Sequence, residues 1–135
     1  MIVRKQAEAL ARAAFTLMEM LVVVAILVVL AGAAVPIYLN YLDNAKKDRV
    51  KADFKVIETA VQSYYINTGA FPQNLRDLTK SDPQNGVKAL LEQTSIFDPW
   101  QHEYQLTGEF HPVSQKPKIM SQGPPGGPPM YSWVQ

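Results

Sequence analysis

Few side chains in this sequence have the type and spacing that catalysis requires. His102 and His111 are the only histidines, there is no cysteine, and no serine lies in a G-x-S-x-G elbow. Asp98 and Glu103 could form a pair of carboxylates, but an aspartate directly before a proline is more often a turn former. Because phosphate-binding glycine motifs are also missing, we expect no enzyme activity, and any movement must draw its energy from a partner ATPase.

The charge balance also argues against nucleic-acid binding. The chain has 135 residues, with 13 lysines and arginines against 12 aspartates and glutamates. A basic stripe that could neutralise phosphates is therefore missing, and no nucleic acid is expected among the partners. The length suits one domain at most. Function must then come from the way in which apolar and charged residues are distributed along the chain.

Glu19 has the most unusual surroundings of the charged residues. It is the only formal charge between Ala13 and Leu42, and residues 20–35 read MLVVVAILVVLAGAAV, which is apolar on every face of a helix. About 20 such residues cross the core of a bilayer. The excess of basic residues before this segment favours a cytoplasmic N-terminus. We therefore expect a single membrane-spanning helix.

Composition leaves three fates open for this segment. It could be a secretory signal with an apolar core from Met20 to Leu30 and cleavage within Ala31–Ala33, or it could be an uncleaved anchor. Glu19 favours a third fate, because a carboxylate at the head of a lipid-facing helix costs on the order of 2.5–3.5 kcal/mol and tends to be paired. Cleavage just before Phe15 would create an α-amino group four residues from Glu19.

Residues 14–19, AFTLME, followed by the apolar run, resemble the class III signal of type IV pilins and type II secretion pseudopilins. The resemblance implies that a prepilin peptidase cuts between Ala14 and Phe15 and that Phe15 is then N-methylated. It also implies that Glu19 pairs with the new amine, on its own or a neighbouring subunit, and so guides assembly. Pro36 occupies a position where this family often has a helix-loosening proline. The departure is Ala14, because glycine is usual there.

After Pro36 the pattern changes to that of an amphipathic helix. Apolar residues recur at spacings of four and three, with charged residues between them, at Val50, Phe54, Ile57, Val61 and Tyr64. We predict that this stripe packs within the chain, and that the helix runs on from the membrane segment to Thr68. Gly69 suits a left-handed cap directly after it.

Short helical turns and aromatic residues follow Gly69. Leu75 and Leu78 predict one helical turn and residues 87–92 a second, separated by a loop at 81–86. Four aromatic residues further on are expected in the core, because a unit of this size needs large apolar side chains to fill one. They are Phe97, Trp100, Tyr104 and Phe110.

The remaining residues predict a small sheet. Residues 103–107 and 109–113 are expected to form a β-hairpin around Gly108, with a further strand at 118–121. Laid on the apolar stripe, such a sheet would cover both apolar faces. The predicted fold class is therefore α+β, a long N-terminal hydrophobic and amphipathic α-helix packed against a small C-terminal antiparallel β-sheet.

Strings in the C-terminal half narrow the resemblance to the major pseudopilin of type II secretion systems. They are NTGAFP at 67–72, DPW at 98–100 with a tyrosine at 104, and SW at 132–133. The resemblance spans essentially the whole chain and implies a pilin-like organisation. Its parts are a leader peptide at 1–14, a transmembrane and filament-core helix at 15–39, an amphipathic helix at 40–68, and a globular region at 69–135 with a Pro/Gly-rich loop at 123–129.

The resemblance implies a structural subunit of a type II secretion pseudopilus. Such a subunit is inserted in the bacterial inner membrane, with its C-terminal domain in the periplasm, and supports protein secretion once polymerised. Its implied partners are copies of itself in a helical homopolymer, the prepilin peptidase, an assembly ATPase, a platform membrane protein and minor pseudopilins. A type IV pilin for adhesion, motility or DNA uptake is the alternative. A periplasmic binding protein with an ordinary signal peptide is the third reading.

Major pseudopilins commonly hold a calcium ion in a C-terminal loop. The corresponding stretch at 123–129 reads GPPGGPP, and no aspartate or glutamate follows Phe110. Calcium prefers six to eight oxygen ligands, with carboxylates to balance its charge. We therefore predict neither calcium nor another cofactor. Proline rigidity would replace the ion, or else the loop would be a floppy, polyproline-like excursion.

Overall fold

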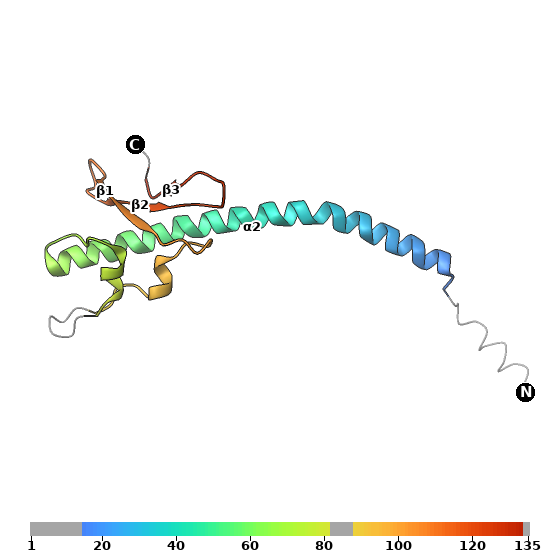
Figure 1. Cartoon of the computed structure of the whole chain (residues 1–135), viewed down its shortest axis with the longest axis horizontal. Coiled ribbons are helices and arrows are strands. Elements are labelled where there is room, and N and C mark those ends of the chain that lie inside the picture. The colour runs from blue at the N-terminus through green and yellow to red at the C-terminus, as the bar shows by residue number, and fades with distance from the viewer. Residues whose placement is uncertain (1–14, 82–87, 134–135) are drawn as a thin grey trace, which may run out of the picture. The chain divides into compact units, whose positions relative to one another are not determined.

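The computed structural model of the chain describes residues 15–81 and 88–133. The predicted leader, with Ala14, and most of the predicted loop at 81–86 lie outside the described residues. The chain divides into two compact units after Leu42. In chain order the elements are the helix α2 (Leu17–Thr68), the 3₁₀ helices η1 (Leu75–Thr79) and η2 (Gln93–Ile96), and the strands β1 (Gln105–Phe110), β2 (Pro117–Ser121) and β3 (Met130–Tyr131) (Figure 1).

The predicted continuous helix is confirmed as α2, which Figure 1 draws as one uninterrupted ribbon. In its first half the large apolar side chains are uncovered, from 37% exposed at Leu42 to 83% at Leu17. Its length and composition are sufficient to cross a membrane. The predicted cap is also confirmed, because Gly69 has φ +75° and its N–H donates to the carbonyl of Tyr65 at 2.8 Å.

The second half of α2 provides one wall of the core. Val50, Ile57 and Val61 are fully buried, as the apolar stripe predicts, and Tyr64 packs against them from the edge. The opposite wall comes from η1, η2 and the sheet. Burying each large aliphatic side chain stabilises the fold by about 1.5–3 kcal/mol. The residues outside α2 that complete this core are Leu75, Leu78, Leu91, Ile96, Tyr104 and Ile119.

The sheet has the order β1-β2-β3 and is antiparallel throughout. The predicted hairpin around Gly108 is wrong, because β1 runs straight through this residue and pairs with β2. Gly108 has φ +77°, and the register shifts between Leu106 and Phe110. A left-handed glycine inside a strand produces a bulge instead of a turn. The turn lies at 111–116, and the predicted strand at 118–121 is confirmed within β2.

The helical turn predicted at 87–92 is wrong over its described part, because residues 88–92 are not helical. The backbone N–H groups of Leu90 and Leu91 both donate to the carbonyl of Leu78, at 2.8 and 3.0 Å. These amides therefore bind η1 instead of a turn of their own. The second helical turn comes later, as η2, whereas the one predicted around Leu75 is confirmed as η1.

The aromatic residues expected in the core divide into two groups. Tyr104 is buried, and Trp100 packs against the core while remaining half-buried. Phe97 and Phe110 are 36% and 40% exposed, so their placement in the core is wrong. Phe110 instead packs on the surface against Phe71, with ring centroids 4.8 Å apart. The aliphatic residues of η1 and η2 take the interior positions that these two rings were expected to fill.

Candidate functional site

The predicted assembly residue Glu19 closes a reciprocal cap at the start of α2. Its Oε2 atom accepts hydrogen bonds from the backbone N–H of Thr16 at 2.8 Å and from the Thr16 hydroxyl at 3.1 Å. The backbone N–H of Glu19 in turn donates to the Thr16 hydroxyl oxygen at 3.2 Å. This is the capping box that a T-x-x-E spacing allows, and the positive end of the helix dipole favours the carboxylate there.

Phe15 lies immediately before this cap and outside the helix, with its side chain 74% exposed. In the unprocessed chain its nitrogen is a peptide amide without charge, so the predicted pair between an amine at Phe15 and Glu19 stays a prediction. Thr16, which sequence reasoning missed, is the partner that Glu19 has in this structure. The threonine three residues before the glutamate was the signal that could have identified it.

Pro36, the second predicted assembly residue, lies inside α2 together with Gly32. A proline has no N–H, so the carbonyl four residues earlier, that of Gly32, has no helical donor. Apart from the neighbouring residues and backbone of α2 itself, no atom of the described residues lies within 4 Å of the place where a side chain on Gly32 would begin. The helix therefore has a missing hydrogen bond and an uncovered glycine within one turn. Both features weaken the helix at residues 32–36.

Asp98 is a buried carboxylate at the centre of the C-terminal unit, with 2% of its surface exposed. Its Oδ1 atom accepts the backbone N–H groups of Trp100 at 3.0 Å and His102 at 2.8 Å. Its Oδ2 atom accepts the hydroxyl of Ser121 at 2.7 Å. The prediction that Asp98 forms a turn is confirmed, because its carbonyl also accepts the N–H of Gln101 at 3.0 Å.

The two histidines have structural contacts. The Nδ1 atom of His102 lies 3.6 Å from Oδ2 of Asp98. His111 shapes the turn between β1 and β2, where its Nδ1 atom accepts the N–H groups of Val113 and Ser114 at 3.3 and 3.2 Å. The carboxylates named with them are also used in structural contacts, because Glu103 accepts from Arg76 and Asp98 accepts from the hydroxyl of Ser121.

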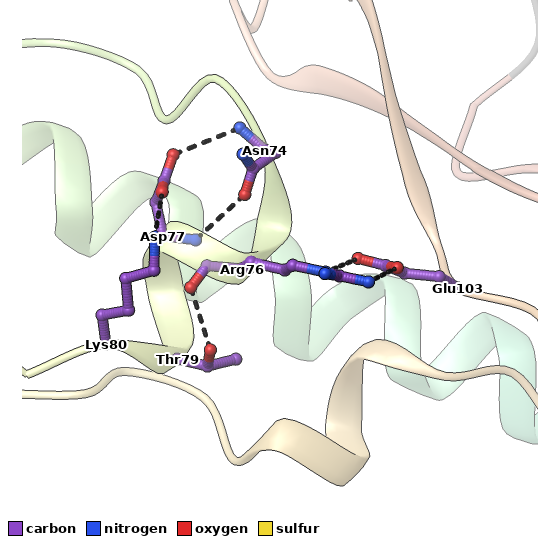
Figure 2. Close-up of polar contacts among 6 residues, drawn as sticks. All are labelled: Asn74, Arg76, Asp77, Thr79, Lys80 and Glu103. Carbon is purple, nitrogen blue, oxygen red and sulfur yellow. Dashed lines mark hydrogen bonds and ion pairs between the residues drawn. The ribbon is translucent and has the colours of Figure 1, made fainter.

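Glu103 binds Arg76 across the C-terminal unit (Figure 2). The guanidinium donates from Nε to Oε1 at 2.9 Å and from Nη2 to Oε2 at 2.8 Å. This bidentate contact lowers the pKa of Glu103 below its ordinary value and raises that of Arg76. Because Arg76 belongs to η1 and Glu103 precedes β1, the pair joins the 3₁₀ segment to the chain that enters the sheet.

A second cap fixes the helix that carries Arg76. The side chain of Asn74 accepts the N–H of Asp77 at 3.2 Å, and the Asp77 carboxylate accepts the N–H of Asn74 at 3.4 Å. Figure 2 shows both contacts, and also the bond from the Thr79 hydroxyl to the Arg76 carbonyl at 2.9 Å. The polar groups of this short turn are thereby paired locally, which leaves the Arg76 side chain directed at Glu103.

Tyr104 connects the segment before β1 to α2. Its hydroxyl donates to Oδ2 of Asp53 at 2.8 Å, and its ring meets Phe54 edge to face with centroids 5.6 Å apart. Burial raises the pKa of Tyr104 well above its ordinary value, and the hydrogen bond to Asp53 raises it further. The phenol therefore stays protonated and remains a donor throughout the physiological range.

Both halves of the chain match families of known proteins. Residues 37–129 match the family described as type II secretion system (T2SS), protein G, and residues 10–35 match the prokaryotic N-terminal methylation motif. The second match covers the predicted processing and assembly residues as far as residue 35. No solved structure gives a significant match to the chain.

Curated relatives cover most of the chain. The type II secretion system core protein G of Dickeya chrysanthemi is 32% identical over 126 residues, which are 84% of this chain and 78% of the relative. That of Klebsiella pneumoniae is also 32% identical and covers 84% of this chain and 86% of its own. The type IV major pilin protein PilE1 of Neisseria gonorrhoeae is 32% identical over 74 residues, 55% of this chain and 45% of its own.

Proposed function

Because this chain belongs to the type II secretion system protein G family, we propose that it is the pseudopilin whose copies polymerise, through the apolar half of α2, into the secretion pseudopilus. The observation that carries the proposal is the exposure of this half. Its large apolar side chains are 44–83% exposed between Leu17 and Leu30. Apolar surface in water costs about 25 cal/mol per Å². A bilayer can cover this surface first, and the helices of other copies can cover it in the filament.

Processing creates the polar half of the same assembly site. A prepilin peptidase cuts between Ala14 and Phe15, and Phe15 then carries an amine that is N-methylated. The N–H of Thr16, the next residue, already binds the Glu19 carboxylate at 2.8 Å. The new positive charge therefore arises one residue from an acceptor that is held in place. A charge pair in an apolar setting contributes little net stability, but a register that leaves either charge unpaired is strongly disfavoured.

The remaining steps are membrane insertion and extraction into the filament, as in other type II secretion systems. The chain is inserted in the bacterial inner membrane with residues 43–135 in the periplasm. An assembly ATPase and a platform membrane protein extract it into the filament, and minor pseudopilins join the same fibre. The methylation motif and the exposed apolar helix support this order of events.

Substitution of Glu19 tests the proposal in cells that carry the secretion system. Glu19→Ala is expected to insert in the membrane and to be cleaved before Phe15, yet to be absent from sheared or overexpressed filaments. Thr16→Ala is the matched control, because it removes the hydroxyl of the cap and keeps both the carboxylate and the amine. Normal incorporation of the Glu19→Ala protein would contradict the role of this carboxylate in assembly.

A type IV pilin for adhesion, motility or DNA uptake is the second candidate. The observation in its favour is the identity to PilE1, which covers 55% of this chain against 84% for two of the secretion relatives. Deletion of the gene separates the two functions. A secretion pseudopilin leaves its cargo in the periplasm when it is lost, whereas loss of a pilin abolishes surface fibres and leaves secretion unchanged.

A further inference from the structure

The loop between β2 and β3, residues 122–129, does not have the oxygen ligands of a calcium site. Calcium requires six to eight oxygens and favours carboxylates. No aspartate or glutamate occurs after Phe110 in the sequence. Within residues 15–81 and 88–133, no three side chains of the His, Asp and Glu types gather to form a metal cluster. The donor set of this loop therefore does not fit the ion that its family commonly holds there.

Two oxygens of the loop and its first turn already bind protein groups. The Ser121 hydroxyl donates to Oδ2 of Asp98 at 2.7 Å and accepts the N–H of Gly123 at 3.1 Å. The carbonyl of Pro124 accepts the N–H of Gly127 at 2.9 Å. Coordination of a cation by these atoms would break the hydrogen bonds that shape the loop.

A lysine on β2 lies against the aromatic residues that follow the loop. Lys118, on β2, has its ammonium group 4.8 Å from the centre of the Tyr131 ring and 5.0 Å from that of Trp133. These rings closely follow the loop in the chain. The same ammonium group binds Oε2 of Glu109 at 2.8 Å, so its charge is paired within the sheet and is not available to the loop.

Asp98 is the charged group of the protein that contacts the start of the loop, through Ser121, where the family commonly holds a bound ion. Its side chain is fully buried and accepts three hydrogen bonds, two from the amides of Trp100 and His102 and one from Ser121. Ser121 is itself 1% exposed. A buried carboxylate with several donors is a strong and fixed acceptor. The hydroxyl of Ser121 therefore has one defined orientation, with its lone pair available to the N–H of Gly123.

Close packing within the loop supports this arrangement. Gly123 has φ +75°, and a Cβ atom there would lie 2.5 Å from the carbonyl oxygen of Pro128. A Cβ atom on Gly127 would lie 2.6 Å from Cγ of Pro124. The four prolines of the loop also reduce the conformational entropy of the unfolded segment.

We propose that Asp98, acting through Ser121, anchors the first turn of loop 122–129, so that this loop keeps its fold without calcium. Asp98 and Ser121 are positioning residues in this proposal. They act on the loop through the hydrogen bond from Gly123. The inference concerns the order of the loop and is independent of filament formation.

The test uses the full chain in detergent micelles, with amide hydrogen exchange and thermal unfolding measured in EGTA and in millimolar calcium chloride. For the unaltered protein we expect the same melting temperature and the same exchange of residues 122–129 in both buffers. Ser121→Ala is expected to accelerate exchange at Gly123 about tenfold, because both hydrogen bonds of the Ser121 hydroxyl are lost. The N–H of Gly123 then has no acceptor there, and Oδ2 of Asp98 loses this donor. Calcium should not reverse this acceleration.

Ser114→Ala is the matched control, because Ser114 lies exposed in the turn at 111–116 and its hydroxyl makes no contact with Asp98. It should leave exchange at Gly123 unchanged. The calcium comparison on the unaltered chain needs no substitution, so it decides the question even if Ser121→Ala fails to fold. A calcium-dependent rise in melting temperature that magnesium does not reproduce would overturn the proposal. Unchanged exchange at Gly123 in a folded Ser121→Ala protein would overturn it as well.

Discussion

Gln101 adopts a backbone conformation that usually belongs to glycine. Its φ angle is +70°, and its N–H closes the turn onto the carbonyl of Asp98. For an L-residue with a Cβ atom, the left-handed region costs roughly 1–2 kcal/mol. The turn is kept because the buried carboxylate of Asp98 binds the amides on both sides of Gln101, those of Trp100 and His102.

Gln101→Gly should therefore stabilise the protein. We expect the free energy of unfolding to rise by about 0.5–1 kcal/mol, since the relief of strain exceeds the extra entropy of glycine in the unfolded chain. Denaturant unfolding of the full chain in detergent measures the change. Gln73→Gly serves as the control, because Gln73 is exposed and has no positive φ angle. A loss of stability in Gln101→Gly equal to that in the control would contradict the strain argument.

At the scale of elements, α2 has two halves whose apolar side chains differ in exposure. The first half has exposed apolar side chains on all sides, whereas the second half has one buried stripe with Ile57 at its centre. Ile66, near the end of α2, is 73% exposed, although it is the same residue type as the buried Ile57. Two isoleucines of one helix therefore differ in how much they contribute to the core.

This contrast gives a prediction about the core. Ile57→Ala should lower the free energy of unfolding of the C-terminal unit by about 2–5 kcal/mol, because it removes buried surface and leaves a cavity. Ile66→Ala makes the same chemical change at an exposed position of the same helix and should alter stability by less than about 0.5 kcal/mol. Denaturant unfolding followed by tryptophan fluorescence compares the two. Equal losses would show that the stripe is not the core face.

At the scale of the whole molecule, the proposed place of cleavage determines whether the mature chain keeps a segment that could cross a membrane. Cutting before Phe15 keeps the apolar run of α2 on the mature protein, whereas an ordinary signal cleavage near Ala34 would remove most of it. The two outcomes give proteins of different mass and different solubility.

We expect the mature protein to begin at Phe15, with a methyl group on its amine, and to stay in the membrane fraction after an alkaline wash. Intact mass and N-terminal sequencing measure the first property, and fractionation measures the second. Ala14→Lys should block cleavage yet keep the full-length chain in the membrane, because the apolar run is untouched. A soluble protein that starts near Ala34 would contradict both expectations.

The local sequence determined the long helix, its cap and its buried stripe. Periodicity at Val50, Phe54 and Ile57, and a glycine directly after Thr68, are properties of neighbouring residues and do not depend on the rest of the fold. The cap between Thr16 and Glu19 was equally local, although the glutamate alone was recognised. The apolar run that ends at Val35 likewise requires a cover of lipid or of other helices, because its composition leaves it without a polar face.

Only the tertiary structure decided which polar groups meet and where the strands turn. Glu103 finds Arg76, Tyr104 finds Asp53 and Ser121 finds Asp98 across 27, 51 and 23 residues of chain. Gly108 could end a strand or form a bulge within it, and the pairing of Leu106 and Phe110 with β2 on either side of it selected the bulge. The physical reason is that short strands and single ion pairs carry little local preference. Their partners are selected by the burial of the core as a whole, which residues distant in sequence build together.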